Sequence, residues 1–297
     1  MWQRKRDGTD GSDGMPPPSR AEPMQRGGAV MRGPVVVGVD GSPSSLVAVE
    51  IAARTAEYQG VELQLVHAVD WPAGPPADGT GAWGLRPERE RAGVNGALAE
   101  AERWARRAAP GVDVRCEVLL GEPAQVLESE SRDAGLTVVG HQPLGNGGRL
   151  HHSVGGQLLA RGPRPVLVVC GRQEPGGPVV LVGGESTAAR QAAEFAFAEA
   201  EARRVPLLVL DIRRMWQRRS HSLPASLLIR LRERYPEVAV SRQLVRGRIR
   251  RSLIRLSADV QLVVAGSHGR RGASGPLDAA VLRDMACPVA VVRSGRQ

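Results

Sequence analysis

The chain alternates between short apolar runs and longer segments in which apolar residues recur at helical spacing. The first run, PVVVG at 34–38, is apolar at consecutive positions, which is typical of a strand buried on both faces. Ser42 followed by Pro43 is a helix start signal, and Gly60 is placed to end that helix. The next apolar run, at 61–69, predicts a second strand.

The same alternation continues almost to the end of the chain and restarts once, after a linker at 171–177. We therefore predict an internal repeat with five strands in each half, and helices between the strands. Such alternation favours parallel sheets covered by helices on both faces, with ligands at the carboxyl ends of the strands where strand order reverses. The other expected strands lie at 112–121, 136–140, 164–170, 178–182, 205–212, 238–245, 260–266 and 287–293.

Composition supports buried cores and argues against a nucleic-acid partner. Hydrophobic residues make up 42% of the chain but aromatic residues only 3%, so bases would find few side chains to stack on. The net charge of +9 comes almost entirely from arginines, because Lys5 is the only lysine. These arginines are scattered and accompany the Ala, Gly, Pro and Val content typical of a GC-rich genome, so a solvated basic surface is the preferred interpretation.

Cysteine usage and the N-terminal segment indicate a cytoplasmic protein. The three cysteines, Cys116, Cys170 and Cys287, are far apart and form no CxxC pair, which argues against a disulfide framework or a zinc site. No apolar run approaches the ~20 residues needed to cross a bilayer. Residues 1–33 contain no signal-peptide pattern and are expected to be a disordered tail.

Two glycine-containing loops are the strongest candidates for ligand chemistry. Each follows the fourth strand of its half and leads through a short helix to the fifth, starting at Gly140 in the first half and at Gly266 in the second. A glycine turn before a helix gathers backbone N–H groups that can bind phosphate. The alternative is that the glycines only permit a tight turn between strand and helix, and both interpretations stay open.

The two halves resemble tandem domains of the universal stress protein family. The resemblance covers about 34–171 and 177–294 and is carried by VVVGVDGSPSS at 35–45, LVHAVD at 65–70 and the two loop–helix–strand endings. It implies two five-stranded parallel α/β domains of the adenine nucleotide α-hydrolase-like, Rossmann-like type. It also implies ATP as cofactor, with Mg²⁺, since some members bind ATP through a Gly-x-x-Gly, nine-residue, Gly-Ser/Thr signature and an aspartate after the first strand.

The match to that signature is partial in both halves. Pro143 replaces the second glycine of the first loop, and Ala279 and Ala280 replace the Gly-Ser pair of the second. In the second half Gly183 or Gly184 stands where the aspartate belongs. The nucleotide-binding positions that the resemblance implies are Val39, Asp40, Ala68, Gly140, Ser153, Val154, Gly266 and Gly269.

No catalytic or metal-ligating constellation accompanies these loops. Adjacent His151 and His152 point apart on a helix, and no nucleophile-elbow motif is present. We therefore expect a stress-response protein that is not an enzyme and that binds adenine nucleotide. The alternative is a nucleotide-free interaction module, and in either case the last strands of the two halves can pair edge to edge into an intramolecular pseudo-dimer. A homodimer is a further expected assembly, and neither nucleic acid nor membrane is an expected partner.

Overall fold

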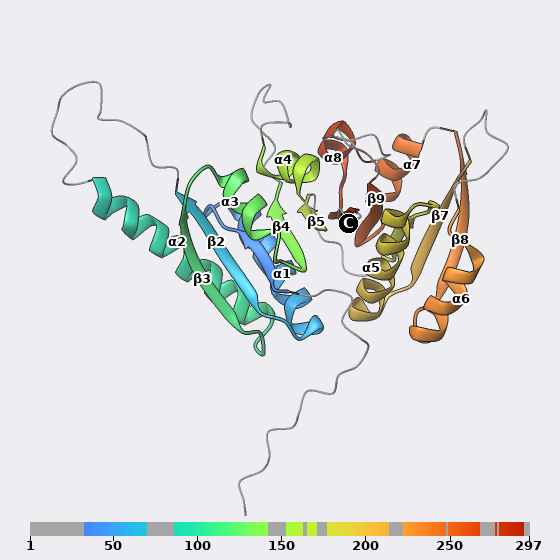
Figure 1. The fold of residues 1–297 in the computed structure, drawn as a ribbon, viewed down its shortest axis with the longest axis horizontal. Helices are drawn as coiled ribbons and strands as arrows, with labels where there is room; N and C mark the ends of the chain where they lie inside the picture. The colour runs from blue at the N-terminus through green and yellow to red at the C-terminus, as the bar shows by residue number, and fades with distance from the viewer. Residues whose placement is uncertain are drawn as a thin grey trace, which may run out of the picture.

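The two halves of the chain join into one continuous sheet. A computed structural model describes residues 33–69, 86–141, 153–162, 165–170, 177–213, 222–247, 249–267, 277 and 279–293. Ten strands lie side by side in the order β3-β2-β1-β4-β5-β10-β9-β6-β7-β8 (Figure 1). All pairs are parallel except β5 with β10, where the halves meet. The structure thus confirms the α/β repeat and the edge-to-edge pairing of the last strands.

Each half runs through the same succession of elements. The first contains β1 (Val35–Gly38), α1 (Pro43–Gln59), β2 (Leu63–Val69), α2 (Arg86–Ala108), β3 (Val114–Leu120), α3 (Pro123–Glu130), β4 (Leu136–Gly140), α4 (Val154–Arg161) and β5 (Val166–Val169). The second contains β6 (Val179–Val182), α5 (Thr187–Arg203), β7 (Leu207–Arg213), α6 (Ala225–Arg234), β8 (Val240–Arg246), α7 (Ile249–Leu256), β9 (Leu262–Ser267), α8 (Ala279–Asp284) and β10 (Val289–Arg293).

Local sequence explains where the first helix starts and stops. Ser42 is the N-cap of α1, and its hydroxyl accepts from the Ser45 N–H at 3.2 Å. Pro43 opens the helix, where its missing N–H costs nothing. Gly60 ends it in the left-handed conformation, at φ 64°. The equivalent position in α5 is Arg204, also left-handed at φ 54°.

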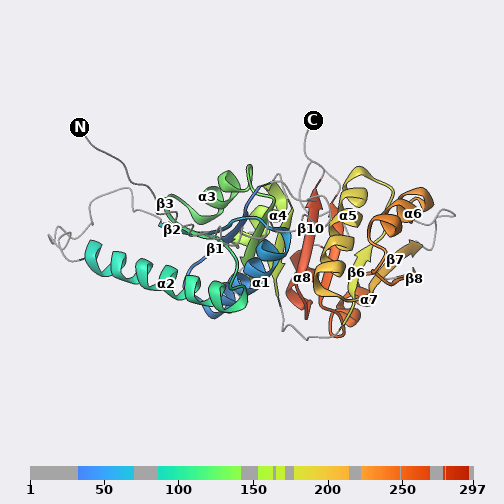
Figure 2. The ribbon, with the colours of Figure 1, turned by 90° about the horizontal axis from the view of Figure 1, so that it is seen from below.

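Helices cover both faces of the sheet. The largest apolar cluster contains residues of α1, α2, α5 and α6 on one face and runs from one half into the other. Two separate clusters lie on the opposite face, one under α3 and α4 and one under α7 and α8. Figure 2, seen from below, shows α1 and α2 beside the strands of the first half and α5 and α6 beside those of the second.

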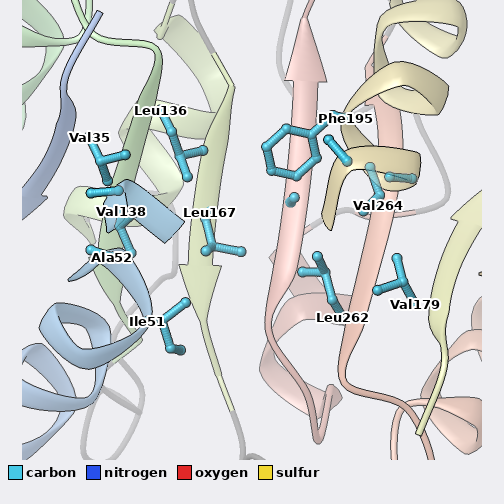
Figure 3. Packing of buried hydrophobic residues seen from close by; sticks show 14 of the residues in the cluster. Val35, Ile51, Ala52, Leu136, Val138, Leu167, Val179, Phe195, Leu262 and Val264 are labelled. Carbon is cyan, nitrogen blue, oxygen red and sulfur yellow. The ribbon is translucent and has the colours of Figure 1, made fainter. Parts of the chain in front are cut away.

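The junction between the halves is a two-fold arrangement. In the antiparallel pairing of β5 with β10, Leu167 lies opposite Ala290, and these two residues are equivalents of each other in the repeat. On the shared face, Ile51 of α1 and Phe195 of α5 occupy equivalent helix positions and belong to one cluster with Leu167 (Figure 3). The repeated domain therefore pairs with itself as a symmetric dimer would, within one chain.

Candidate functional site

The strand order creates one switch point in each half. β1 pairs with β2 on one side and with β4 on the other, so the chain departs in opposite directions from the β1–β4 pair. β6 has the same relation to β7 and β9. Ligands of open α/β sheets bind outside the carboxyl ends of the strands at such a point. The loops after β1 and β4 are therefore the candidate site of the first half.

Asp40 follows β1 and is engaged by the start of α1. Its Oδ1 accepts from the Ser42 N–H at 2.9 Å and from the Ser42 hydroxyl at 2.6 Å. Burial raises the pKa of Asp40, but hydrogen bonds from Ser42 and Ser45 outweigh it and leave the pKa below its usual range. Asp40 is thus an ionised acceptor, exposed at the switch point.

Val39 and Ala68 lie at the carboxyl ends of the neighbouring strands β1 and β2. The buried Val39 continues the β1 ladder, since its N–H donates to the Val66 carbonyl at 2.9 Å. Ala68 lies next to the end of β2 and is half-buried. The structure brings both residues to the edge where Asp40 lies.

Gly140 ends β4 and packs directly on the first turn of α1. A Cβ at this position would lie 2.6 Å from the Ser44 carbonyl oxygen and 3.0 Å from the Ser45 nitrogen. Gly266, at the end of β9, has the same relation to α5, with a Cβ falling 2.5 Å from the Ala189 nitrogen. Both glycines permit a close approach of strand end to helix start, a role independent of any ligand.

Ser153 and Val154 begin α4, the helix that follows the first glycine loop. The Ser153 hydroxyl accepts from the Gly156 N–H at 3.1 Å and caps the helix. Val154 is half-buried and packs against the cluster under α3 and α4. Gly269, Pro143, the histidine pair at 151–152 and the rest of both loops, at 142–152 and 268–276, lie outside the described residues.

The second half lacks the polar groups of the first at the matching positions. The Gly183 N–H donates to the Leu210 carbonyl at 2.8 Å, as Val39 does to its neighbour, which makes Gly184 the equivalent of Asp40. Ser186 caps α5 as Ser42 caps α1. Ala188 and Ala189 stand where the first half has Ser44 and Ser45, so the described positions equivalent to Asp40, Ser44 and Ser45 carry no carboxylate or hydroxyl.

Sequence reasoning missed two features of the first site. The hydroxyls of Ser42 and Ser44 lie 3.0 Å apart, and the Ser45 hydroxyl donates to the Ser42 carbonyl at 2.9 Å. The SPSS segment was the available signal for this cluster. His141 comes directly after Gly140, and burial lowers its pKa below the usual histidine range.

Among the described residues, no group of three or more His, Cys, Asp or Glu side chains is arranged to hold a metal ion. Within the same part of the chain, none of the helices has the length and apolar character required to span a membrane.

The universal stress protein family model matches residues 31–169 and 178–293. This chain belongs to the universal stress protein family. Universal stress protein Rv2623 of Mycobacterium tuberculosis is 35% identical over 289 residues, which span 87% of this chain and 96% of that protein.

Solved structures of universal stress proteins share the fold. One from Archaeoglobus fulgidus is similar with a TM-score of 0.67 at 16% identity, covering 89% of this chain and 97% of that chain. Another, in complex with cAMP, is 30% identical and covers 47% of this chain and 97% of that chain, with a TM-score of 0.38.

Proposed function

We propose that the first half of this universal stress protein binds one adenine nucleotide, ATP with its Mg²⁺, and acts through conformation and interactions in a cytoplasmic stress response. The observation that carries the proposal is Asp40, an ionised carboxylate at the switch point beside β4. The proposed contacts in this half come from Val39, Asp40, Ala68, Gly140, Ser153 and Val154.

Asp40 suits the sugar of a nucleotide. A carboxylate has about four lone-pair sites, so the two hydrogen bonds that Oδ1 accepts from Ser42 leave room for ribose hydroxyls. Those same hydrogen bonds fix the orientation of the side chain before a ligand arrives, which lowers the entropy cost of binding. The edge of β2 at Ala68 supplies backbone beside this position for the base.

The start of α4 suits the phosphates. A helix N-terminus presents unpaired N–H groups and the positive end of its dipole. The Ser153 hydroxyl accepts from one of these N–H groups, that of Gly156. In the second half, Gly266 and Gly269 are proposed as remnants of the same signature. The absence of a carboxylate at Gly184 makes this the weaker half.

Binding without dedicated catalysis is part of the proposal. Phosphoryl transfer or hydrolysis requires a positioned base and carboxylates that hold a metal ion. The residues that the structure describes around β1 and β4 offer Asp40 as the one carboxylate at the switch point, and Ser42 already engages it. We therefore infer that Mg²⁺ arrives with the nucleotide and that the bound state itself is the signal.

A nucleotide-free interaction module is the second candidate. It is favoured by the close packing of Gly140 and Gly266, because this packing accounts for both glycines without a ligand. The two candidates differ in whether Asp40 binds a ligand or only stabilises the start of α1.

Calorimetric titration of the full chain with ATP and Mg²⁺ separates the two candidates. Loss of a charged hydrogen bond in Asp40→Ala is expected to weaken binding by about 10- to 100-fold. Asp113→Ala removes an exposed aspartate just before β3, at the amino-terminal end of the strands and away from the site. This variant is expected to bind as the parent does. Absence of binding at millimolar ATP in the parent chain would overturn the proposal in favour of the interaction module.

A further inference from the structure

Two cysteines from different halves meet at the junction. The antiparallel register pairs Val168 with Val289 and Val166 with Val291. Continuing this register by two residues brings Cys170, just after β5, opposite Cys287, just before β10. The two positions are separated by 117 residues of sequence.

Their side chains share one face of the sheet and one core. Cys170 lies two residues after Val168, and Cys287 lies two residues before Val289. Because side chains two residues apart on a strand point to the same face, both thiols point to the face covered by α8. Both belong to the same apolar cluster and are 3% and 1% exposed. The Cys170 thiol donates to the Cys287 carbonyl at 3.0 Å, which places the sulfur against its partner residue.

This placement meets the geometric requirement for a disulfide. Directly opposed residues of antiparallel strands have Cα atoms about 4.5–5.5 Å apart. Disulfides span Cα separations of roughly 4.4–6.8 Å. The extended register thus places the two cysteines within the range that a disulfide spans, and the 3.0 Å contact of the Cys170 sulfur with the Cys287 carbonyl agrees with this.

We propose that Cys170 and Cys287 form a redox-modifiable dithiol that closes into a disulfide across the junction under peroxide stress. One thiolate attacks the peroxide O–O bond, which gives a sulfenic acid and releases one oxygen as water. The second thiol then attacks the sulfenic sulfur, forms the S–S bond and releases a second water. Two thiols and one peroxide thus yield one disulfide and two waters, and a thiol reductant reverses the change.

Burial sets the pace of this reaction. Burial first, and the neighbouring Cys287 thiol second, raise the pKa of Cys170 to about 12, and burial likewise raises the pKa of Cys287 to about 12. Because the thiolate is the reactive form, both thiols stay reduced through brief exposure. The exposed Cys116 reacts first with any reagent in solution. The pair therefore responds to sustained oxidation.

The link would fix the pseudo-dimer. The only strand pairing between the halves, among the described residues, is that of β5 with β10. A bond at its end ties the first half to the second and constrains a long loop of the unfolded chain, which stabilises the folded form.

The test uses the full chain with Cys116→Ser, so that intermolecular bridges cannot form through the exposed thiol. After incubation with hydrogen peroxide for hours, intact mass, peptide mapping and thermal unfolding are measured before and after reduction with dithiothreitol. The expected result is a loss of two hydrogens, a 170–287 linked peptide and a midpoint raised by roughly 5–15 °C, all reversed by the reductant.

Two further variants supply controls in the same background. Cys170→Ala and Cys287→Ala are each expected to abolish the linked peptide and the peroxide-dependent rise in the unfolding midpoint. Their melting curves before peroxide treatment show whether they fold. Two outcomes overturn the proposal. Either both thiols stay free after prolonged peroxide, or they accumulate separate sulfinic acids without the cross-link.

Discussion

Gly140 provides the sharpest test of how the switch point is built. In Gly140→Ala the new Cβ would lie 2.6 Å from the Ser44 carbonyl oxygen, 2.7 Å from the Ser44 carbonyl carbon and 3.0 Å from the Ser45 nitrogen. All three are backbone atoms in the first turn of α1, which no rotamer change can move aside. The strand end or the helix start must therefore shift.

The expected change in the free energy of unfolding for Gly140→Ala is the sum of two opposing terms. Overpacking of this kind costs about 1–3 kcal/mol. Replacing glycine by alanine also reduces the freedom of the unfolded chain, which stabilises the fold by roughly 0.4–1 kcal/mol. Because the clash is with backbone, we expect the first term to win and the free energy of unfolding to fall by about 1–2 kcal/mol.

Urea unfolding of the ligand-free full chain, followed by circular dichroism, measures this difference. Gly96→Ala is the matched control, since Gly96 lies on the exposed side of α2 with no atom within 4 Å of an added Cβ. That variant is expected to gain about 0.5–1 kcal/mol from helix propensity. An unchanged midpoint for Gly140→Ala, beside the expected gain for Gly96→Ala, would refute the packing explanation and leave phosphate binding as the reason for the glycine.

Three further changes test separate parts of the structure. Asp40→Asn is expected to lower stability at neutral pH, and the difference from the parent should disappear as pH falls through the lowered pKa of Asp40, below about 4, in pH-dependent unfolding. Ser153→Ala removes the N-cap of α4 and should cost about 1 kcal/mol in urea unfolding. Arg204→Gly places glycine at a left-handed position, as at the equivalent Gly60 of the first half. The backbone strain of Arg204 is removed, so thermal unfolding should show about 1 kcal/mol of added stability.

The strands and helix boundaries could be predicted because their signals are local. Ser42, Pro43 and Gly60 mark the two ends of α1 in the sequence, and the structure confirms them. The buried parallel strands are short apolar runs such as 136–140, where the structure places β4. The repeat of these signals also predicted a sheet in each half.

Features that depend on contacts between distant residues were beyond local signals. Gly140 was visible as a glycine, but its close approach to Ser44 depends on how β4 packs against α1. The sequence left Gly183 and Gly184 as alternatives, and backbone pairing with Leu210 resolved them. Cys170 and Cys287 are far apart in the sequence, which argued against a disulfide framework, because their proximity follows only from the register of β5 with β10.

The central claim is that one of the two related switch points holds a nucleotide and the other does not. Equilibrium dialysis of the full chain against saturating ATP and Mg²⁺ counts the nucleotides bound per chain. Our account gives one per chain, with about 10- to 100-fold more ATP needed to reach the same occupancy in Asp40→Ala. Two per chain would contradict the distinction between the halves, and none would contradict nucleotide binding itself.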